Sequence, residues 1–289
     1  MSLLLNNPTG RPRTVLALVH TLRALGGTAN KAKLLELLMP LRKTSTATDP
    51  FDQTVACARG LDFVSVEGKT ISLKMRSGIC FEDAVHAQLS SSASGPEKLI
   101  LALMASVVVR IEDEGAEWLR ADAPRFAALA RERLPEGLGT FNKDRVPAWR
   151  DWVSACGLGY QTAARGNLAR PIGQFTPRVT TRLGRELQAE LRPSAGTEVK
   201  AKDVIQLVAS RMPYLDGGSL FEDAKRSFGL DLAGRCSMAL TDALRDLELQ
   251  GVLTLQQRGG DDRNMVQLAE DGAQPPAFES VRFLEGVEA

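Results

Sequence analysis

Residues 49–73 read DPFDQTVACARGLDFVSVEGKTISL, and this stretch decides the fold of the first part of the chain. Asp49-Pro50 has the form of a helix cap followed by proline at the first helical position, and the helix should run to about Gly60. Two short strands follow, Phe63–Val66 and Thr70–Leu73, around a glycine-containing turn. The stretch therefore predicts a helix followed by a β-hairpin.

Two further helices are expected upstream of this hairpin. Thr14–Leu25 carries apolar side chains at helical spacing and is followed by a glycine pair that ends the helix. A second helix, capped by Thr28 or Asn30, should stop near Pro40. Three helices followed by a β-hairpin is the order of a winged helix-turn-helix, so we predict one over residues 1–76.

The same order of elements recurs later in the chain. The expected elements are helices over Lys202–Met212, Ser219–Gly229 and Cys236–Gln250, then strands over Val252–Gln256 and Met265–Leu268. The second of these helices should start at a capping box formed by Ser219 and Glu222. We therefore predict a second winged helix over residues 196–270, followed by an acidic and partly disordered tail over 271–289.

The region between the two modules, residues 77–195, is predicted to be helical. Helices are expected over Phe81–Leu89, Glu97–Glu114, Pro124–Leu134 and Val146–Cys156, with another that starts at Thr176-Pro177 and includes Leu191. The expected fold class is thus mainly α with small β-hairpin wings, as tandem winged helix-turn-helix modules that flank a helical middle region. No signal peptide and no apolar run of membrane-spanning length is visible, so we expect a cytoplasmic protein.

Local charge, rather than the net charge of +1, indicates where DNA could bind. Residues 1–76 hold eleven Lys and Arg against five Asp and Glu, and residues 165–192 hold six against two. A recognition helix at Pro50–Gly60 would offer few base-reading side chains, so weak sequence specificity is expected. The expected DNA-contact residues are Lys31, Lys33, Arg42, Lys43, Thr44, Thr48, Gln53, Thr54, Arg59, Lys69, Lys74, Arg76, Arg178, Arg182 and Arg185.

The sequence contains no recognised catalytic, metal-binding or cofactor-binding pattern. His20 and His86 each fall in a predicted helix among apolar residues, and the four cysteines have no metal-ligand spacing and are expected to be free and buried. Glu112–Glu114 should form a solvated helix face, whereas Trp149 and Trp152 share a helix face and should pack in the core. We therefore expect a non-enzymatic protein with no metal and no cofactor.

Several short motifs resemble those of one known family: the opening Met1–Pro8 with Val15–Leu25, Trp149–Trp152 with Gly157–Gly159, and Phe175–Pro177 leading to Leu183. Together they resemble DpdG-like proteins, accessory components of bacterial systems that insert 7-deazaguanine derivatives into DNA and restrict foreign DNA. The resemblance implies a DNA context and an ATPase or helicase-like partner. It implies no catalytic residue.

Three functions remain open from the sequence. The first is a DNA-binding accessory subunit of a bacterial antiviral defence complex. The second is a tandem winged-helix scaffold that resembles the kite proteins, which dimerise and bind kleisin in SMC-type complexes. The third is a transcription regulator whose middle region dimerises or binds a ligand. Because the wing tip of the C-terminal module carries Asp261-Asp262, that module is expected to contact protein subunits rather than DNA.

Overall fold

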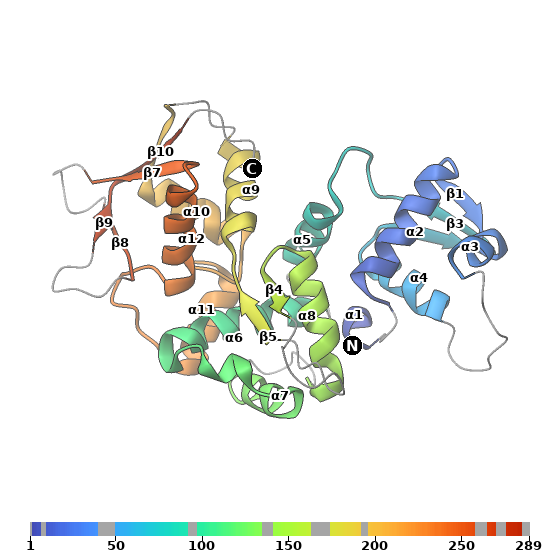
Figure 1. Ribbon diagram of the computed structural model, residues 1–289, viewed down its shortest axis with the longest axis horizontal. Coiled ribbons are helices and arrows are strands. Elements are labelled where there is room, and N and C mark those ends of the chain that lie inside the picture. Colours follow the sequence, from blue (N-terminus) through green and yellow to red (C-terminus); the bar gives the residue numbers. More distant parts are fainter. Residues whose placement is uncertain are drawn as a thin grey trace. The chain divides into compact units, whose positions relative to one another are not determined.

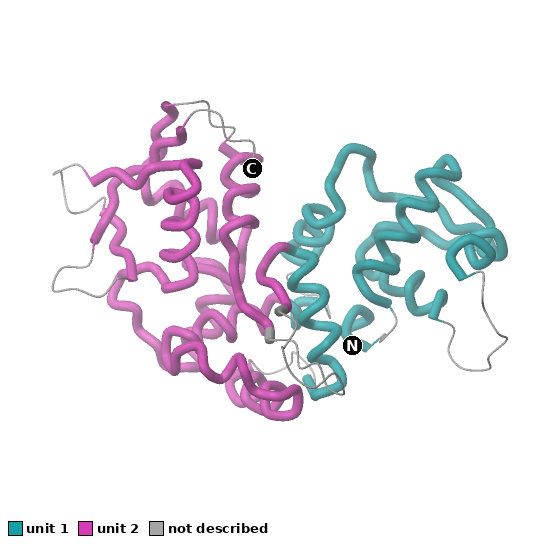
Figure 2. Tube along the Cα trace, viewed as in Figure 1, with its two compact units in different colours: residues 1–100, 141–156 teal, residues 101–140, 157–289 magenta. Residues whose placement is uncertain are grey.

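A computed structural model describes residues 2–6, 10–39, 50–91, 97–134, 141–162, 174–191, 196–257, 265–269 and 276–284. The protein is mainly helical with small antiparallel sheets, as the sequence predicted (Figure 1). It divides into two compact units, unit 1 with residues 1–100 and 141–156, and unit 2 with residues 101–140 and 157–289 (Figure 2). Residues 77–195, the expected middle region, contribute to both units.

Unit 1 contains a three-stranded antiparallel sheet in the order β1-β3-β2. Its elements are α1 (Leu3–Asn6), α2 (Pro12–Ala24), β1 (Thr28–Asn30), α3 (Lys31–Leu38), α4 (Pro50–Gly60), β2 (Val64–Glu67), β3 (Thr70–Leu73), α5 (Phe81–Ser91), the start of α6 (Lys98–Glu114), η2 (Lys143–Arg145) and α8 (Val146–Ala155). Helix α4 and the β2–β3 hairpin lie where the sequence predicted them. Strand β1 was not predicted, and it lies next to β3, with which it pairs in antiparallel orientation.

The core of unit 1 forms where α2 packs against α3, α4 and β3. Of the apolar stripe that the sequence predicted here, Val15, Leu18, Val19 and Leu22 are fully buried, whereas Leu25, just after α2, is exposed. Trp149 and Trp152 on α8 are also fully buried, which confirms their expected place in the core. These side chains supply most of the large apolar volume that holds the helices of this unit together.

Unit 2 contains the remainder of α6 and three separate sheets, with strand orders β6-β10-β7, β4-β5 and β8-β9. Its other elements are η1 (Glu117–Arg120), α7 (Ala123–Arg131), β4 (Gly159–Thr162), β5 (Gln174–Pro177), α9 (Thr180–Leu191), β6 (Glu198–Lys200), α10 (Ala201–Arg211), α11 (Ser219–Phe228), α12 (Met238–Leu249), β7 (Leu253–Gln256), β8 (Val266–Gln267), β9 (Ala277–Phe278) and β10 (Ser280–Phe283). All of the strand pairs are antiparallel.

Unit 2 repeats the element order of unit 1. Elements α9, β6, α10, α12, β7 and β10 follow one another as α2, β1, α3, α4, β2 and β3 do. In each set the last strand lies between the other two, and the first helix packs against the second and third helices. Helix α11 and the β8–β9 pair are additions to the second set. The first helix of this second set is α9, which precedes the boundary that the sequence suggested at residues 195–196.

The predicted second hairpin does not form. Strand β7 pairs with β10, with Leu255 opposite Val281, whereas β8 pairs with β9. Val281 and Phe283 are buried. Residues 276–284 of the expected disordered tail are therefore an integral part of the second module, and the wing tip over Asp261-Asp262 lies outside the described residues.

One predicted helix start and one predicted helix cap are also wrong. Thr176-Pro177 ends strand β5, and the next helix begins at Thr180. Helix α11 is capped by Gly218 without a side-chain hydrogen bond, rather than by a capping box. A Cβ atom at Gly218 would lie 2.5 Å from the carbonyl oxygen of Pro213, so glycine is required where the chain passes this close.

Candidate nucleic-acid interface

The exposed cations of the first module gather near the two ends of strand β3. At one end, Lys69 occupies the β2–β3 turn, and its carbonyl oxygen accepts a hydrogen bond of 2.8 Å from the backbone N–H of Lys31. This bond fastens the turn to the start of α3, beside Lys33. At the other end, Lys74 and Arg76 follow the strand. The five residue-to-residue steps from Lys69 to Lys74 span roughly 16 Å in an extended strand.

Some of these cations are ion-paired. Three of the expected contact lysines lie beside acids on the surface: Lys31 beside Asp52, Lys33 beside Glu36 at 3.1 Å, and Lys74 beside Asp62. Exposed pairs of this kind contribute little stability, so a phosphate can displace the acid at small cost. Arg59, Lys69 and Arg76 are exposed and have no acidic partner among the described residues. The module therefore presents cations that are free or weakly held.

Helix α4 offers few side chains for reading bases. Asp52 and Arg59 are exposed on it, and Gln53 is half-buried. The expectation that Thr54 faces DNA is wrong, because Thr54 is buried and its hydroxyl lies 3.1 Å from that of Thr14. The positions outside the described residues are Arg42, Lys43, Thr44 and Thr48.

The second basic stretch does not form one exposed cationic face. Arg178 precedes α9, and its guanidinium binds Asp246 at 3.0 Å. Arg182 is 2% exposed and pairs with Glu186, so its expected phosphate contact is wrong. Because α9 packs against α12, its buried face includes Arg182 as well as the apolar stripe. Arg185 is half-buried.

Two carboxylates lie at the start of α12 in unit 2. Asp216 accepts hydrogen bonds of 2.6 Å from both the backbone N–H and the hydroxyl of Ser237, the N-cap residue. Glu112 accepts a hydrogen bond from the N–H of Met238 and pairs with Arg235 at 3.2 Å. The expected solvated position of Glu112 is wrong, since its side chain is 1% exposed. Both acids are stabilised by the positive end of the helix dipole.

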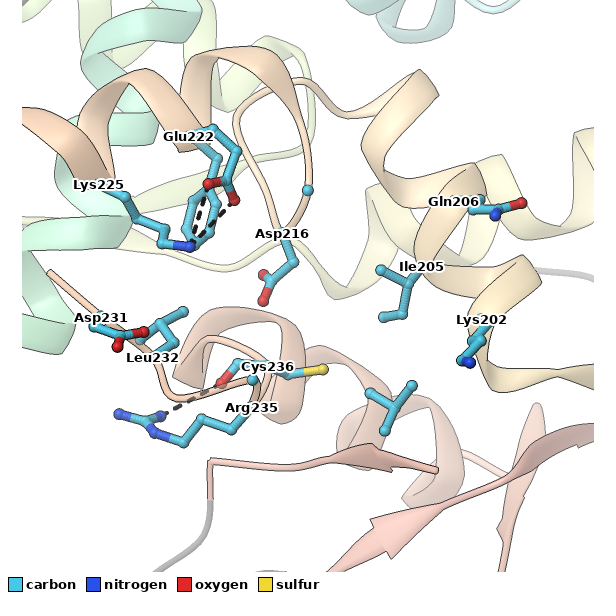
Figure 3. A pocket seen from close by; sticks show the side chains of 14 residues that line it. Lys202, Ile205, Gln206, Asp216, Glu222, Lys225, Asp231, Leu232, Arg235 and Cys236 are labelled. Atoms are coloured by element: carbon cyan, nitrogen blue, oxygen red, sulfur yellow. Dashed lines mark hydrogen bonds and ion pairs between the residues drawn. The ribbon is translucent and has the colours of Figure 1, made fainter. Parts of the chain in front are cut away.

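A cavity of about 350 Å³ adjoins this cluster (Figure 3). Figure 3 shows Asp216 between side chains of α10 on one side and of α11 on the other. Within it Lys225 pairs with Glu222 at 3.2 Å. Burial raises the pKa of the Cys236 thiol far above its ordinary range, so this group remains protonated and is a poor nucleophile. The cavity thus combines balanced charges with an inert thiol.

The raised pKa of Asp216 makes stability depend on pH. Burial raises this pKa above its ordinary value of 3.8, and the hydrogen bonds from Ser237 oppose the shift. Because the native state holds this proton more tightly than the unfolded state, the resulting stabilisation is present at low pH and is lost as pH rises through the folded pKa. We expect urea titrations above about pH 4 to show the wild type losing stability relative to Asp216→Asn. A difference that does not change with pH would contradict the raised pKa.

The side chains considered for catalysis or metal binding lie apart. His86 is buried and His20 is exposed, each on a helix as predicted. All four cysteines are free, and Cys80 is exposed, contrary to the expected burial. Within the described ranges, no three or more His, Cys, Asp or Glu side chains are grouped so that they could hold a metal ion. In the same part of the chain, no helix has both the length and the apolar character to cross a membrane.

The fold and these surfaces define a mainly helical protein with small antiparallel sheets and an exposed cationic hairpin turn. A family model described as DpdG-like matches residues 1–261, and the chain belongs to this family. This confirms the resemblance seen in the sequence and associates the protein with 7-deazaguanine DNA modification systems. No curated protein and no solved structure gives a significant match.

Proposed function

We propose that the chain is a non-enzymatic DNA-binding or adaptor subunit of a bacterial complex that modifies DNA and restricts foreign DNA. In this proposal residues 12–73 act as a winged helix-turn-helix. The order α2-β1-α3-α4-β2-β3 and the strand order β1-β3-β2 support it. The observation that carries the DNA contact is the hairpin turn with Lys69, held against the start of α3 beside Lys31 and Lys33.

In such a contact, α4 would enter the major groove while the cations of the hairpin turn bind phosphates. The exposed face of α4 holds one acid, Asp52, and one arginine, Arg59, so base-specific bonds are few. Affinity then comes mainly from counterion release, which falls steeply as salt rises. This arrangement favours weakly sequence-specific binding of duplex DNA.

The test is a fluorescence anisotropy titration of a labelled DNA duplex at several salt concentrations. The double variant Lys33→Glu, Lys69→Glu is expected to bind at least about tenfold more weakly and to lower the salt slope by about 0.9 for each phosphate that it no longer neutralises. The matched control is Lys200→Glu, Lys202→Glu, which makes the same charge change at two exposed lysines where β6 meets α10 in unit 2. Equal losses of affinity in both variants, or no wild-type binding at low salt, would contradict DNA binding by the first module.

The adaptor function is favoured by the second module. The exposed side chains of α12 include Met238, Asp242 and Leu249, and Leu249 is 85% exposed. Exposed apolar side chains such as Met238 and Leu249 suit contact with a protein partner. We propose that this module docks another subunit of the complex, such as an ATPase or helicase-like protein, as the winged helices of kite-like scaffolds do.

A further inference from the structure

Tyr160 is the exposed aromatic residue of this protein. The described residues include every Phe, Trp and Tyr of the chain, and all of these except Tyr160 are buried or half-buried. Tyr160 is 46% exposed and lies on β4, in the two-stranded β4–β5 sheet of unit 2. A partly exposed ring of this kind offers a flat face on which another planar group can stack.

A groove of about 360 Å³ opens beside Tyr160, within unit 2. Val179, the residue just before α9, lines it together with Ala239 and Ala243 from α12. The two alanines are one helical turn apart, so their small side chains leave room next to the ring. The volume lies at the lower end of the range for ligand pockets and suits a group of about the size of one nucleotide.

Two arginines stand along this groove and are held in place by acids. The Nε and Nη2 atoms of Arg178 lie 3.1 and 3.0 Å from the same carboxylate oxygen of Asp246. The hydroxyl of Thr180 donates to that oxygen at 2.7 Å. Arg245, which also lines the groove, donates to Glu248 at 2.8 Å. A guanidinium has five N–H donors, so the contacts of Nε and Nη2 with Asp246 fix the direction of Arg178 and leave other donors of Arg178 for a ligand.

We propose that this groove binds an exposed nucleobase of single-stranded DNA together with a neighbouring phosphate. The base stacks on Tyr160, and Arg178 and Arg245 bind the phosphate. The exposed carboxylate of Asp242 accepts hydrogen bonds from amino groups on the base edge. A base inside a duplex cannot reach the ring without leaving the stack, so the groove selects unpaired strands.

This proposal is independent of duplex binding by the first module. The groove lies in unit 2, whereas Lys33 and Lys69 lie in unit 1. Either site can therefore fail without the other. Lys33→Glu, Lys69→Glu is expected to retain binding of single strands, and substitution of Tyr160 is expected to retain binding of duplex.

The primary experiment is an anisotropy titration of the full chain with a fluorescein-labelled single-stranded oligonucleotide of mixed sequence. Tyr160→Ala is expected to weaken binding about 5- to 100-fold, the loss of affinity that corresponds to one stacked base. Tyr160→Phe keeps the ring and should bind within about twofold of wild type, because stacking needs no hydroxyl. Arg245→Gln should lower the salt slope by about 0.7, as expected when one phosphate of a single strand is no longer neutralised.

The second readout locates the strand on the protein. Ultraviolet crosslinking of an oligonucleotide that contains 5-bromouracil, followed by mass spectrometry, should label a peptide that contains Tyr160. The proposal would be overturned by unchanged affinity of Tyr160→Ala, by crosslinks confined to other segments, or by no wild-type binding of single strands at low salt. If the groove binds a peptide rather than a nucleotide, the wild type is expected to show no binding of single strands at low salt. Circular dichroism of each variant checks that the fold is kept, and Tyr160→Phe provides the folded comparison.

Discussion

Replacement of Trp149 by alanine is expected to lower the free energy of unfolding by about 3–5 kcal/mol, the usual cost of deleting a buried indole. The ring is fully buried, and its Nε1–H donates to the carbonyl oxygen of Ile100 at 3.0 Å. Phe141 packs edge-on against it, with ring centroids 6.5 Å apart. Alanine would leave a cavity in unit 1 and remove the hydrogen bond to Ile100. Urea denaturation followed by far-ultraviolet circular dichroism measures the destabilisation.

Trp118 gives the matched control for this prediction. It is half-buried in unit 2, where it stacks on Phe126 at 5.3 Å and lies under the guanidinium of Arg110 at 5.2 Å. Trp118→Ala removes less buried area and should cost only about 1–2 kcal/mol. Equal destabilisation at the two positions would mean that Trp149 is not a central part of the core.

Replacement of Asp216 by alanine should cost about 2–4 kcal/mol. Asp216 accepts both donors of Ser237, and Ser237 is fully buried, so alanine leaves a buried N–H and a buried hydroxyl without this acceptor. Each unsatisfied buried group costs about 1–3 kcal/mol, and relief from desolvation of the carboxylate offsets part of the sum. The same urea titration measures the change.

Asp203→Ala is the control for the destabilisation at Asp216. Asp203 is exposed in the first turn of α10, so its removal should change stability by no more than about 0.5 kcal/mol. Hydrogen exchange should also show that Asp216→Ala exposes the first turn of α12 more than the rest of the second module. Uniform loss of protection across the module would contradict a local role in holding this helix start.

Short-range sequence patterns located α4 and the β2–β3 hairpin correctly. The prediction of the second hairpin failed because it depends on which distant strands pair. Asp49-Pro50 and Gly60 marked the ends of α4, and alternating side chains marked the β2–β3 hairpin. Alternation also located β7, but it carries no information about which strand lies beside it. The partner of β7 is β10, and the predicted partner at Met265–Leu268 belongs to another sheet.

The candidate sites show the same limit. The spacing of Arg178, Arg182 and Arg185 indicates a shared helix face, but only the packing of α9 shows that Arg182 is covered. Glu112 and Met238 are 126 positions apart, so no local pattern could connect that acid with the start of α12. Exposure of Tyr160 is likewise a property of the folded chain and has no signature in the sequence.

Because β10 lies between β6 and β7, this sheet can form only after nearly the whole chain has been synthesised. During synthesis, all three strands of the unit 1 sheet are available once Leu73 has left the ribosome. Strands β6 and β7 can pair only after their common neighbour β10, which ends at Phe283, has been made. Until then β6 and β7 have unpaired edges, and unpaired strand edges promote aggregation of nascent chains. The family match ends at residue 261. A fragment that ended there would lack β10, and β6 and β7 would then have no strand to pair with between them.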